Sequence, residues 1–310
     1  MIRKQEGTFL SEADGLEISA LCIMPEEKTE YRAVVQLVHG MSEHKERYIP
    51  FMEYLAEKGY ITVIHDHRGH GKSVKNPDDL GYMYGGGAEA MLQDIGTVNK
   101  EIHRHFPDLP VILFGHSMGS FMARRYLMTY GEELTGAIIC GTGYTPGAVL
   151  TAGKLCAGVI SKVKGERHRS KFLQKLAFDS YNKRIADKRT ANDWLTKNTE
   201  MVDAYNRDKY CTFLFTVNGY QTLFDVLGFI QKKENIEKIP KNLPVYMIAG
   251  EEDPVGNYGK GVEKVFEEYR KCGIRDLELK LYEDDRHEIL NELDRENVYL
   301  DVKNWILKHI

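Results

Sequence analysis

The stretch that decides the fold is Pro110-Val111-Ile112-Leu113-Phe114-Gly115-His116-Ser117-Met118-Gly119-Ser120. Its first part, 111–114, is short and wholly apolar, which predicts a strand buried on both faces of a parallel sheet. A Gly115-x-Ser117-x-Gly119 pattern follows, and residues 121–127 then have the composition of a helix. Strand, Gly-x-Ser-x-Gly and helix in this order predict a tight turn that lifts the serine hydroxyl above the sheet.

The two glycines of this turn have a physical reason. A tight strand-to-helix turn brings backbone segments so close together that only a residue without Cβ avoids a clash. The turn also places Ser117 at a helix N-terminus, where unpaired N–H groups favour a developing negative charge. Ser117 is therefore the candidate nucleophile.

Composition limits the classes of protein that the chain can belong to. It has 310 residues, 42% of them hydrophobic, which suits one large α/β domain with an insertion or two small domains. A net charge of −4 is too mild to indicate a nucleic-acid partner. No apolar run approaches the roughly 20 residues that span a bilayer, and the N-terminus lacks the apolar core of a signal peptide. Five scattered cysteines without a C-x-x-C pattern then favour a reduced, cytoplasmic protein.

Apolar strands alternate with helical segments through most of the chain. A hairpin is expected from Gly7 to Met24, and further strands are expected at 33–38, 61–64, 111–114, 137–140, 245–249 and 277–282. Helices are expected at 48–58, 88–106, 216–230, 260–271 and 289–310. This alternation predicts a mostly parallel, doubly wound sheet, which binds ligands at the carboxyl ends of its strands.

The alternation stops between Thr145 and Cys211. Helices are expected there at 148–163, 171–178, 191–196 and 201–205, with no buried strand. We therefore expect a core domain made of residues 1–144 and 212–310, with a helical cap inserted at 145–211. The cap has 14 Lys and Arg against 7 Asp and Glu. Its apolar side chains beside lysines are typical of a helix packed on the domain, with peripheral contact to an anionic membrane as the alternative.

A serine nucleophile needs a base within hydrogen-bond reach and an acid that orients the base. On this type of sheet the acid and then the histidine follow later strands. His287 comes directly after the strand expected at 277–282, whereas His168 lies in the cap and His309 ends the last helix. Asp253, after the strand at 245–249 and before Pro254, is the favoured acid. Its rivals are Glu251, Glu252, Asp284 and Asp285.

Acyl transfer also requires two backbone donors for the tetrahedral oxyanion. One is the N–H of Met118, which follows the nucleophile, and the second comes from the loop after the first buried strand. Met41, after His39-Gly40, is the candidate for the second donor.

A competing cluster, His65-Asp66-His67-Arg68-Gly69-His70, has residue types that bind metals. Its spacing is not that of a standard zinc site, and so short a loop would have to fold back to bring the rings together. A structural loop with Asp66 and Arg68 in hydrogen bonds is the preferred interpretation, so no metal is expected.

Five motifs resemble the monoacylglycerol lipase and lysophospholipase branch of the α/β-hydrolases. They are His39-Gly40-x-x-Glu43-His44 with Arg47-Tyr48, Asp66-x-Arg68-Gly69-His70-Gly71-x-Ser73, Gly115-His116-Ser117-Met118-Gly119-Ser120, Gly250-x-x-Asp253-Pro254-Val255 and Arg286-His287-Glu288-Ile289-Leu290-Asn291-Glu292. The resemblance implies an α/β-hydrolase fold with a cap, and hydrolysis of small-molecule acyl esters without a cofactor. Aminopeptidases, feruloyl-type esterases and thioesterases share this scaffold and remain alternatives. The sequence leaves the acyl chain, the head group and the oligomeric state open.

Overall fold

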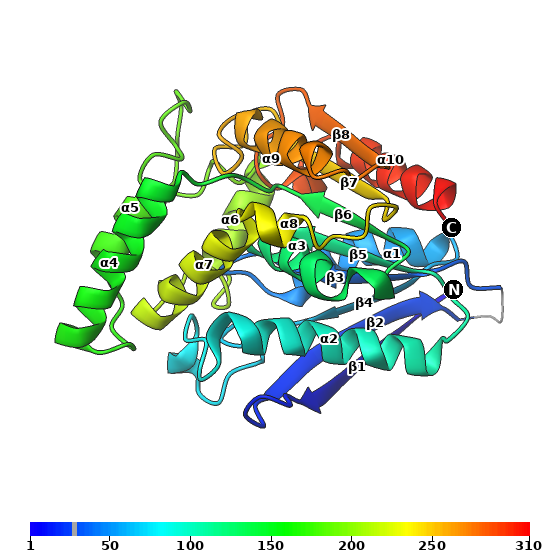
Figure 1. The fold of residues 1–310 in the computed structure, drawn as a ribbon, viewed down its shortest axis with the longest axis horizontal. Coiled ribbons are helices and arrows are strands. Elements are labelled where there is room, and N and C mark those ends of the chain that lie inside the picture. The colour runs from blue at the N-terminus through cyan, green and yellow to red at the C-terminus, as the bar shows by residue number, and fades with distance from the viewer. Residues whose placement is uncertain (27–29) are drawn as a thin grey trace.

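A twisted sheet of eight strands forms the centre of the computed structural model, which describes residues 1–26 and 30–310 (Figure 1). The strand order is β1-β2-β4-β3-β5-β6-β7-β8. Strands β3 to β8 are parallel, and the β1–β2 hairpin joins β4 in the antiparallel sense. The strands are β1 (Ile2–Leu10), β2 (Glu17–Pro25), β3 (Val34–Val38), β4 (Ile61–His65), β5 (Val111–His116), β6 (Gly136–Cys140), β7 (Val245–Gly250) and β8 (Leu277–Tyr282). The predicted doubly wound α/β fold is confirmed.

Helices cover both faces of this sheet. They are α1 (Ile49–Glu57), α2 (Gly87–His105), α3 (Met118–Tyr130), α4 (Gly147–Lys164), α5 (Lys171–Phe178), α6 (Thr199–Arg207), α7 (Val217–Ile230), α8 (Lys233–Ile236), α9 (Lys260–Lys271) and α10 (Arg295–Lys308). One apolar core lies between the sheet and α1 and α10, and the other between the sheet and α2, α3, α7 and α9.

The wholly apolar strands of the sequence are explained by burial on both faces. In β5, Val111 and Leu113 point into the core under α2 and α3, whereas Ile112 and Phe114 point into the core under α1 and α10. All four side chains are buried. A strand between two helical layers needs an apolar side chain at every position, which is the pattern that the sequence shows.

Helices α4 and α5 of the segment 145–211 lie at one end of the molecule, beyond the carboxyl ends of the parallel strands, and both chain termini lie at the opposite end (Figure 1). Helices α4, α5 and α6 match three of the four predicted helices, and α4 packs against α7. Among the described residues, no helix has the length and the apolar character that a membrane crossing requires.

The fourth helix predicted in this segment, at 191–196, is wrong. The stretch is a series of turns, because the Asp193 carboxylate accepts hydrogen bonds from the N–H and the hydroxyl of Thr190 and closes a turn in place of a helix. Its carbonyl oxygens at Asp193 and Thr196 accept from the Arg286 side chain instead.

Two predicted boundaries also differ from the structure. The hairpin strands are longer than Gly7 to Met24 allows, since β1 begins at Ile2 and β2 ends at Pro25. The last helix begins at Arg295 rather than 289, because the carboxylate of Glu292 accepts the N–H of Arg286 in the preceding loop and the N–H of Lys197 in the 145–211 segment.

Candidate active site

The turn at Ser117 has the geometry that its glycines predict. Ser117 has φ 54° and ψ −122°, a strained backbone conformation for a residue with a side chain. A Cβ on Gly115 would collide with the Gly119 carbonyl oxygen, and a Cβ on Gly119 would collide with the Val38 carbonyl oxygen. The Ser117 N–H is fixed by a 3.0 Å hydrogen bond to the Cys140 carbonyl oxygen of β6. The strain is therefore held in place by neighbouring strands.

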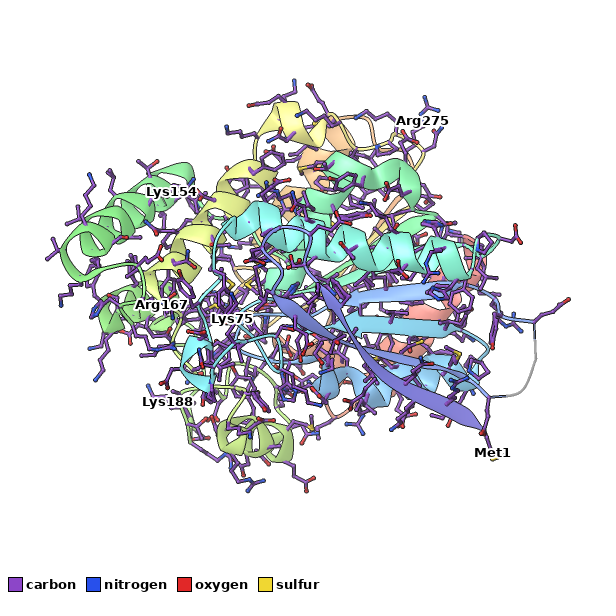
Figure 2. The ribbon with its side chains drawn as sticks, turned by 90° about the horizontal axis from the view of Figure 1, so that it is seen from below. Met1, Lys75, Lys154, Arg167, Lys188 and Arg275 are labelled. Atoms are coloured by element: carbon purple, nitrogen blue, oxygen red, sulfur yellow. The ribbon has the colours of Figure 1, made fainter. Side chains whose placement is uncertain are left out.

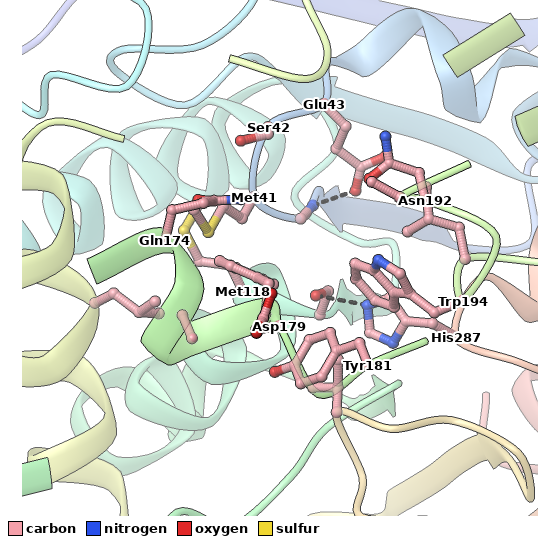
Figure 3. Close-up of a pocket in the computed structure, with 18 of the residues that line it drawn as sticks. Met41, Ser42, Glu43, Met118, Gln174, Asp179, Tyr181, Asn192, Trp194 and His287 are labelled. Atoms are coloured by element: carbon pink, nitrogen blue, oxygen red, sulfur yellow. Dashed lines mark hydrogen bonds between the residues drawn. The ribbon is translucent and has the colours of Figure 1, made fainter. Parts of the chain in front are cut away.

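The three predicted side chains meet in one chain of hydrogen bonds. His287 Nε2 lies 2.7 Å from Ser117 Oγ (Figure 3), and His287 Nδ1 lies 2.9 Å from Asp253 Oδ2. His287 and Asp253 are buried. The other Asp253 oxygen accepts the Val255 N–H at 2.8 Å, which fixes the carboxylate in the loop after β7. Asp253, and none of its four acidic rivals, is the acid in contact with His287.

The loop that carries His287 is held from two sides. Its Asp285 carbonyl oxygen accepts the Glu252 N–H at 2.8 Å from the loop after β7, and the Glu288 N–H donates to the Leu195 carbonyl oxygen at 2.7 Å. The Trp194 ring lies against His287, with ring centroids 5.1 Å apart (Figure 3). The 145–211 segment therefore contacts the imidazole directly, which the sequence did not reveal.

The loop after β3 lies against the serine. A Cβ on Gly40 would be 3.0 Å from Ser117 Cβ, so this loop passes close to the serine. Met41 is the residue that follows Gly40 in the loop. Met118 is the first residue of α3, where the N–H has no partner within the helix. Met41 and Met118 line the same pocket as Ser117. The two predicted donors are thus brought to the same place as the serine.

A buried charged network, absent from the sequence-based prediction, joins these loops. The Gly40 N–H and the Tyr48 hydroxyl donate to Glu43 Oε1 at 2.5 and 2.8 Å, and Arg47 donates to Glu43 Oε2 at 2.7 Å. Arg47 also donates two hydrogen bonds to Glu288, which follows His287. All of these side chains stand in the motifs quoted above, but nothing in the sequence indicated that they contact one another.

The network sets the charge beside the serine. Burial alone would raise the pKa of Glu43, but the hydrogen bond with His116 and the charge of Arg47 hold it well below its usual range. Burial alone would lower the pKa of His116, but Glu43 raises it. His116 Nε2 lies 3.2 Å from the His287 carbonyl oxygen, and the two imidazole rings are 4.8 Å apart. The His116 imidazole therefore lies next to His287, and the Glu43 carboxylate lies next to His116.

The histidine-rich loop after β4 packs rather than converging on one point. The His67 N–H donates to His39 Nε2 at 2.9 Å, and the His67 and His70 rings are 6.1 Å apart. Burial lowers the pKa of His65 and of His70 to about 4. The expected hydrogen bonds of the loop are confirmed, because Asp66 pairs with Lys45 at 2.8 Å and Arg68 pairs with Asp94 at 2.9 Å.

A cavity of about 840 Å³ opens above Ser117. The core contributes one part of its lining and the 145–211 segment contributes the rest (Figure 3). Its apolar lining includes Met41, Met118, Phe121, Val149, Leu176, Phe178, Trp194, Leu195, Phe213, Leu223, Phe224, Leu227 and Val255. Its polar lining includes Ser42, Glu43, Gln174, Asp179, Asn182, Thr190, Asn192 and Tyr205. The serine thus faces a space with an apolar part and a polar part.

The sheet, the tight turn at Ser117 and the hydrogen-bonded chain of Ser117, His287 and Asp253 define an α/β-hydrolase. Residues 29–294 match the family model described as serine aminopeptidase, S33, and the chain belongs to that family. A monoacylglycerol lipase of Mycolicibacterium smegmatis is 26% identical over 306 residues, which cover 91% of this chain and 90% of the relative. These similarities confirm the predicted monoacylglycerol lipase-like branch.

Solved structures agree with this assignment. A highly thermostable carboxyl esterase from Bacillus coagulans, in complex with glycerol, has a TM-score of 0.91 and 31% identity over 99% of this chain and 98% of the esterase. A soluble variant of the monoglyceride lipase of Saccharomyces cerevisiae, in complex with a substrate analog, has a TM-score of 0.76 at 22% identity over 98% of this chain and 94% of that lipase. The second likeness shows the same fold.

Proposed function

We propose that the protein hydrolyses carboxylic acyl esters of the monoacylglycerol or lysophospholipid type through an acyl-enzyme on Ser117. The observation that carries the proposal is the Ser117–His287–Asp253 chain, with distances of 2.7 and 2.9 Å, at the floor of the 840 Å³ cavity. A serine hydroxyl is a poor nucleophile unless a base takes its proton, and this geometry supplies the base.

The chemistry then follows from the positions of these groups. Ser117 Oγ attacks the ester carbonyl carbon while His287 Nε2 takes the hydroxyl proton, and Asp253 keeps the imidazole oriented through Nδ1. The amides of Met41 and Met118 donate to the oxyanion. His287 returns its proton to the leaving alcohol, which departs as the acyl-enzyme forms. Water, deprotonated by His287, then attacks the acyl-enzyme and releases the acid.

The substrate class rests on the cavity and on the relatives. Its apolar lining offers a chain of CH₂ groups a place out of water, and burial of each such group is worth about 0.8 kcal/mol. Its polar side chains offer hydrogen bonds to a hydroxylated head group. The relatives named above as monoacylglycerol lipases and as a carboxyl esterase with bound glycerol agree with a small ester of this kind.

A fluorophosphonate probe tests the nucleophile. We expect the probe to label the native protein at Ser117, and Ser117→Ala to lose both labelling and ester turnover while its circular dichroism stays unchanged. Ser180→Ala, at an exposed serine of the 145–211 segment, is the matched control and keeps both. A native protein that the probe leaves unlabelled, or labelling that survives Ser117→Ala, contradicts the proposal. A panel of monoacylglycerols, lysophospholipids and short esters of graded length then identifies the substrate.

An aminopeptidase-type activity is the second candidate, because the family model carries that description and Asp179 lines the cavity. An aminopeptidase needs a carboxylate for the substrate ammonium, and among the described residues the exposed Asp179 faces the cavity without lying in the buried network. The excess of basic residues in the 145–211 segment opposes such a substrate. Aminoacyl-arylamide turnover above p-nitrophenyl ester turnover would favour this candidate over an esterase.

We also propose that residues 145–211 form a cap whose outer surface contacts anionic membranes. The segment supplies cavity-lining side chains such as Leu176 and Phe178 on one side. On its outer side Leu155, Val159 and Val163 are 66%, 61% and 75% exposed. Lys162 and Lys164 are exposed cations beside these side chains, whereas Lys154 and Arg167, both labelled in Figure 2, pair with Asp225 and Asp79. Apolar side chains among cations are typical of a surface that binds anionic lipid.

A further inference from the structure

We propose that His44, Asp208 and Cys211 form a binding site for a divalent transition-metal ion, with Zn²⁺ as the best match to the donors. Within the part of the chain that the structure describes, these three residues bring a ring nitrogen, a carboxylate oxygen and a sulfur within 4.8 Å of one another. The site lies outside the hydrogen-bonded chain of Ser117. It goes beyond the proposed ester hydrolysis and does not depend on it.

The donor set and its geometry point to zinc. Imidazole nitrogen, thiolate sulfur and carboxylate oxygen are the ligands that Zn²⁺ takes, at about 2.0–2.3 Å. Tetrahedral coordination at those distances puts the ligand atoms about 3.5 Å apart. His44 Nε2 and Asp208 Oδ2 are 2.8 Å apart, so a small widening of this pair and a closer approach of the sulfur would complete three corners. Water would take the fourth.

Neighbouring groups already orient these ligands. His44 Nδ1 lies 2.6 Å from a carboxylate oxygen of Glu46, which leaves Nε2 to face Asp208. A carboxylate behind a ligating imidazole is the usual support of a protein zinc site. The Tyr210 N–H donates to Asp208 Oδ1 at 2.8 Å, so Oδ2 is the oxygen that faces the imidazole. Asp208 and Cys211 share one turn, closed by a 3.1 Å hydrogen bond from the Cys211 N–H to the Asp208 carbonyl oxygen.

The charges of the cluster suit a dication. Asp208 and the thiolate of Cys211 would neutralise the two charges of the ion, and the Cys211 sulfhydryl proton would leave to solvent as the metal–sulfur bond forms. Nearby cations are already paired, Arg47 with Glu43 and Glu288 and Lys45 with Asp66. Cys211 is a buried free thiol, whereas Asp208 is one-third exposed and gives the ion a route from solvent.

An ion here would join two parts of the cavity wall. His44 follows the loop of Met41, while Asp208 and Cys211 end the 145–211 segment and precede the cavity-lining Thr212. The Tyr205 hydroxyl already donates to the Ser42 carbonyl oxygen at 2.9 Å across the same boundary. A bound metal would therefore fasten the 145–211 segment to the loop after β3.

Titration of the full-length, EDTA-treated and desalted protein with Co²⁺ tests the site. We expect saturable uptake of one equivalent, a sulfur-to-cobalt charge-transfer band in the near ultraviolet, and visible bands of four-coordinate Co²⁺. Zn²⁺ should displace the cobalt and, at a hundredfold excess over its Kd, raise Tm by about 3 °C or more. Asp208→Asn should weaken Co²⁺ binding at least tenfold.

Two variants decide whether these three residues hold the ion. Cys211→Ser, checked for an unchanged Tm in EDTA, should lose the ultraviolet band. His309→Ala is the control, because His309 belongs to a second group with Asp276 and Glu278 that contains no sulfur, and it should keep the band. The proposal is overturned if Co²⁺ does not bind saturably, if the band persists in Cys211→Ser, or if Asp208→Asn binds as the native protein does.

Discussion

Arg47 donates two hydrogen bonds to the carboxylate of Glu288, at 2.7 and 2.6 Å, and thereby ties the helical turn after β3 to the loop that carries His287. Both side chains are almost fully buried. Arg47 also binds Glu43, whose other oxygen accepts the Gly40 N–H. One guanidinium thus connects the loop of the proposed oxyanion donor Met41 with the loop of the proposed base.

Removing this guanidinium should cost much stability. In Arg47→Ala two buried carboxylates lose their partner, and breaking a buried ion pair from one side costs about 3–5 kcal/mol. We expect the urea midpoint to fall accordingly and the ester turnover to fall with it, because both loops lose their tie. Arg270→Ala is the control, since Arg270 pairs with Glu267 on an exposed helix face and should leave the midpoint unchanged. Equal midpoints for Arg47→Ala and the native protein would contradict this account.

Asp253→Asn should disturb the orientation of the His287 ring without disturbing the fold. Asparagine retains an oxygen that can accept the Val255 N–H, but its amide no longer fixes the protonated Nδ1 of His287. We expect kcat for a short p-nitrophenyl ester to fall by about 10⁴-fold. The control is Asp284→Asn in the neighbouring loop, where an exposed residue with φ 61° suits asparagine and turnover should stay the same. A loss of less than tenfold in Asp253→Asn would exclude the proposed role.

The turn at Ser117 can be tested with two glycines. A methyl group at Gly119 would collide with the Val38 carbonyl oxygen of β3. Gly119→Ala should therefore push the turn at Ser117 away from β3 and abolish soluble expression or activity. Gly158 lies inside α4, where a methyl group would point into open space, and Gly158→Ala should raise the free energy of unfolding by about 0.4–1 kcal/mol. Urea denaturation measures both. An active, stable Gly119→Ala protein would show that close packing does not explain the motif.

The sequence predicted the sheet and the three-residue chain because both follow from local patterns. Apolar runs mark strands buried on both faces, and the carboxyl ends of parallel strands share one edge, so residues after β5, β7 and β8 had to meet there. Asp253 was favoured over Glu252 and Asp284 by its place after the strand at 245–249 and before Pro254. In the structure Asp253 Oδ2 is the carboxylate oxygen that contacts His287, and its role as the acid stays a prediction.

Long-range polar contacts escaped prediction. Arg47 and Glu288 are 241 residues apart in the sequence, and no local sequence pattern predicts a contact over that separation. The predicted helix at 191–196 failed for the same reason, since Asp193 and Leu195 give their carbonyl oxygens to the loop of His287. Apolar periodicity indicates which face of a helix or strand is buried. It does not indicate which backbone groups will form hydrogen bonds with a distant loop.

The buried histidines should make the protein sensitive to acid. The pKa of His65 is lowered to about 4 by burial, so its imidazole is neutral in the folded protein and becomes charged below about pH 6.5 in the unfolded chain. The unfolded state then binds more protons, and the free energy of unfolding falls by about 1.4 kcal/mol per pH unit between pH 6.5 and about 4 for this one group.

His65→Phe should remove this contribution. Neither ring nitrogen of His65 has a hydrogen-bond partner among the described residues, so phenylalanine loses no polar contact. We expect the drop in unfolding free energy between pH 7.5 and pH 5.0 to be smaller by about 2 kcal/mol in the variant. Urea titrations at the two pH values measure it, and His105→Phe, at an exposed histidine of α2, serves as the control. An identical drop in His65→Phe would mean that His65 does not titrate as described.

The outer surface of the 145–211 segment should bind anionic lipid. Leu155, Val159 and Val163 repeat every four residues on α4 and form one exposed apolar stripe. Inserting such side chains into a bilayer gains about 1.5–3 kcal/mol each when burial is complete. We expect the triple variant L155S/V159S/V163S to bind vesicles of phosphatidylcholine and phosphatidylglycerol at least tenfold more weakly in a sedimentation assay.

The matched control places the same chemical change elsewhere. Leu293 and Leu307 are 74% and 47% exposed outside the segment, and L293S/L307S should bind the vesicles as the native protein does. Turnover of a water-soluble short ester should be the same in both variants, because none of the five residues lines the cavity. Higher salt should weaken native binding, since lysines of the segment supply the attraction to anionic lipid. Native protein that stays in the supernatant, or equal binding by the triple variant, would show that this surface serves another purpose.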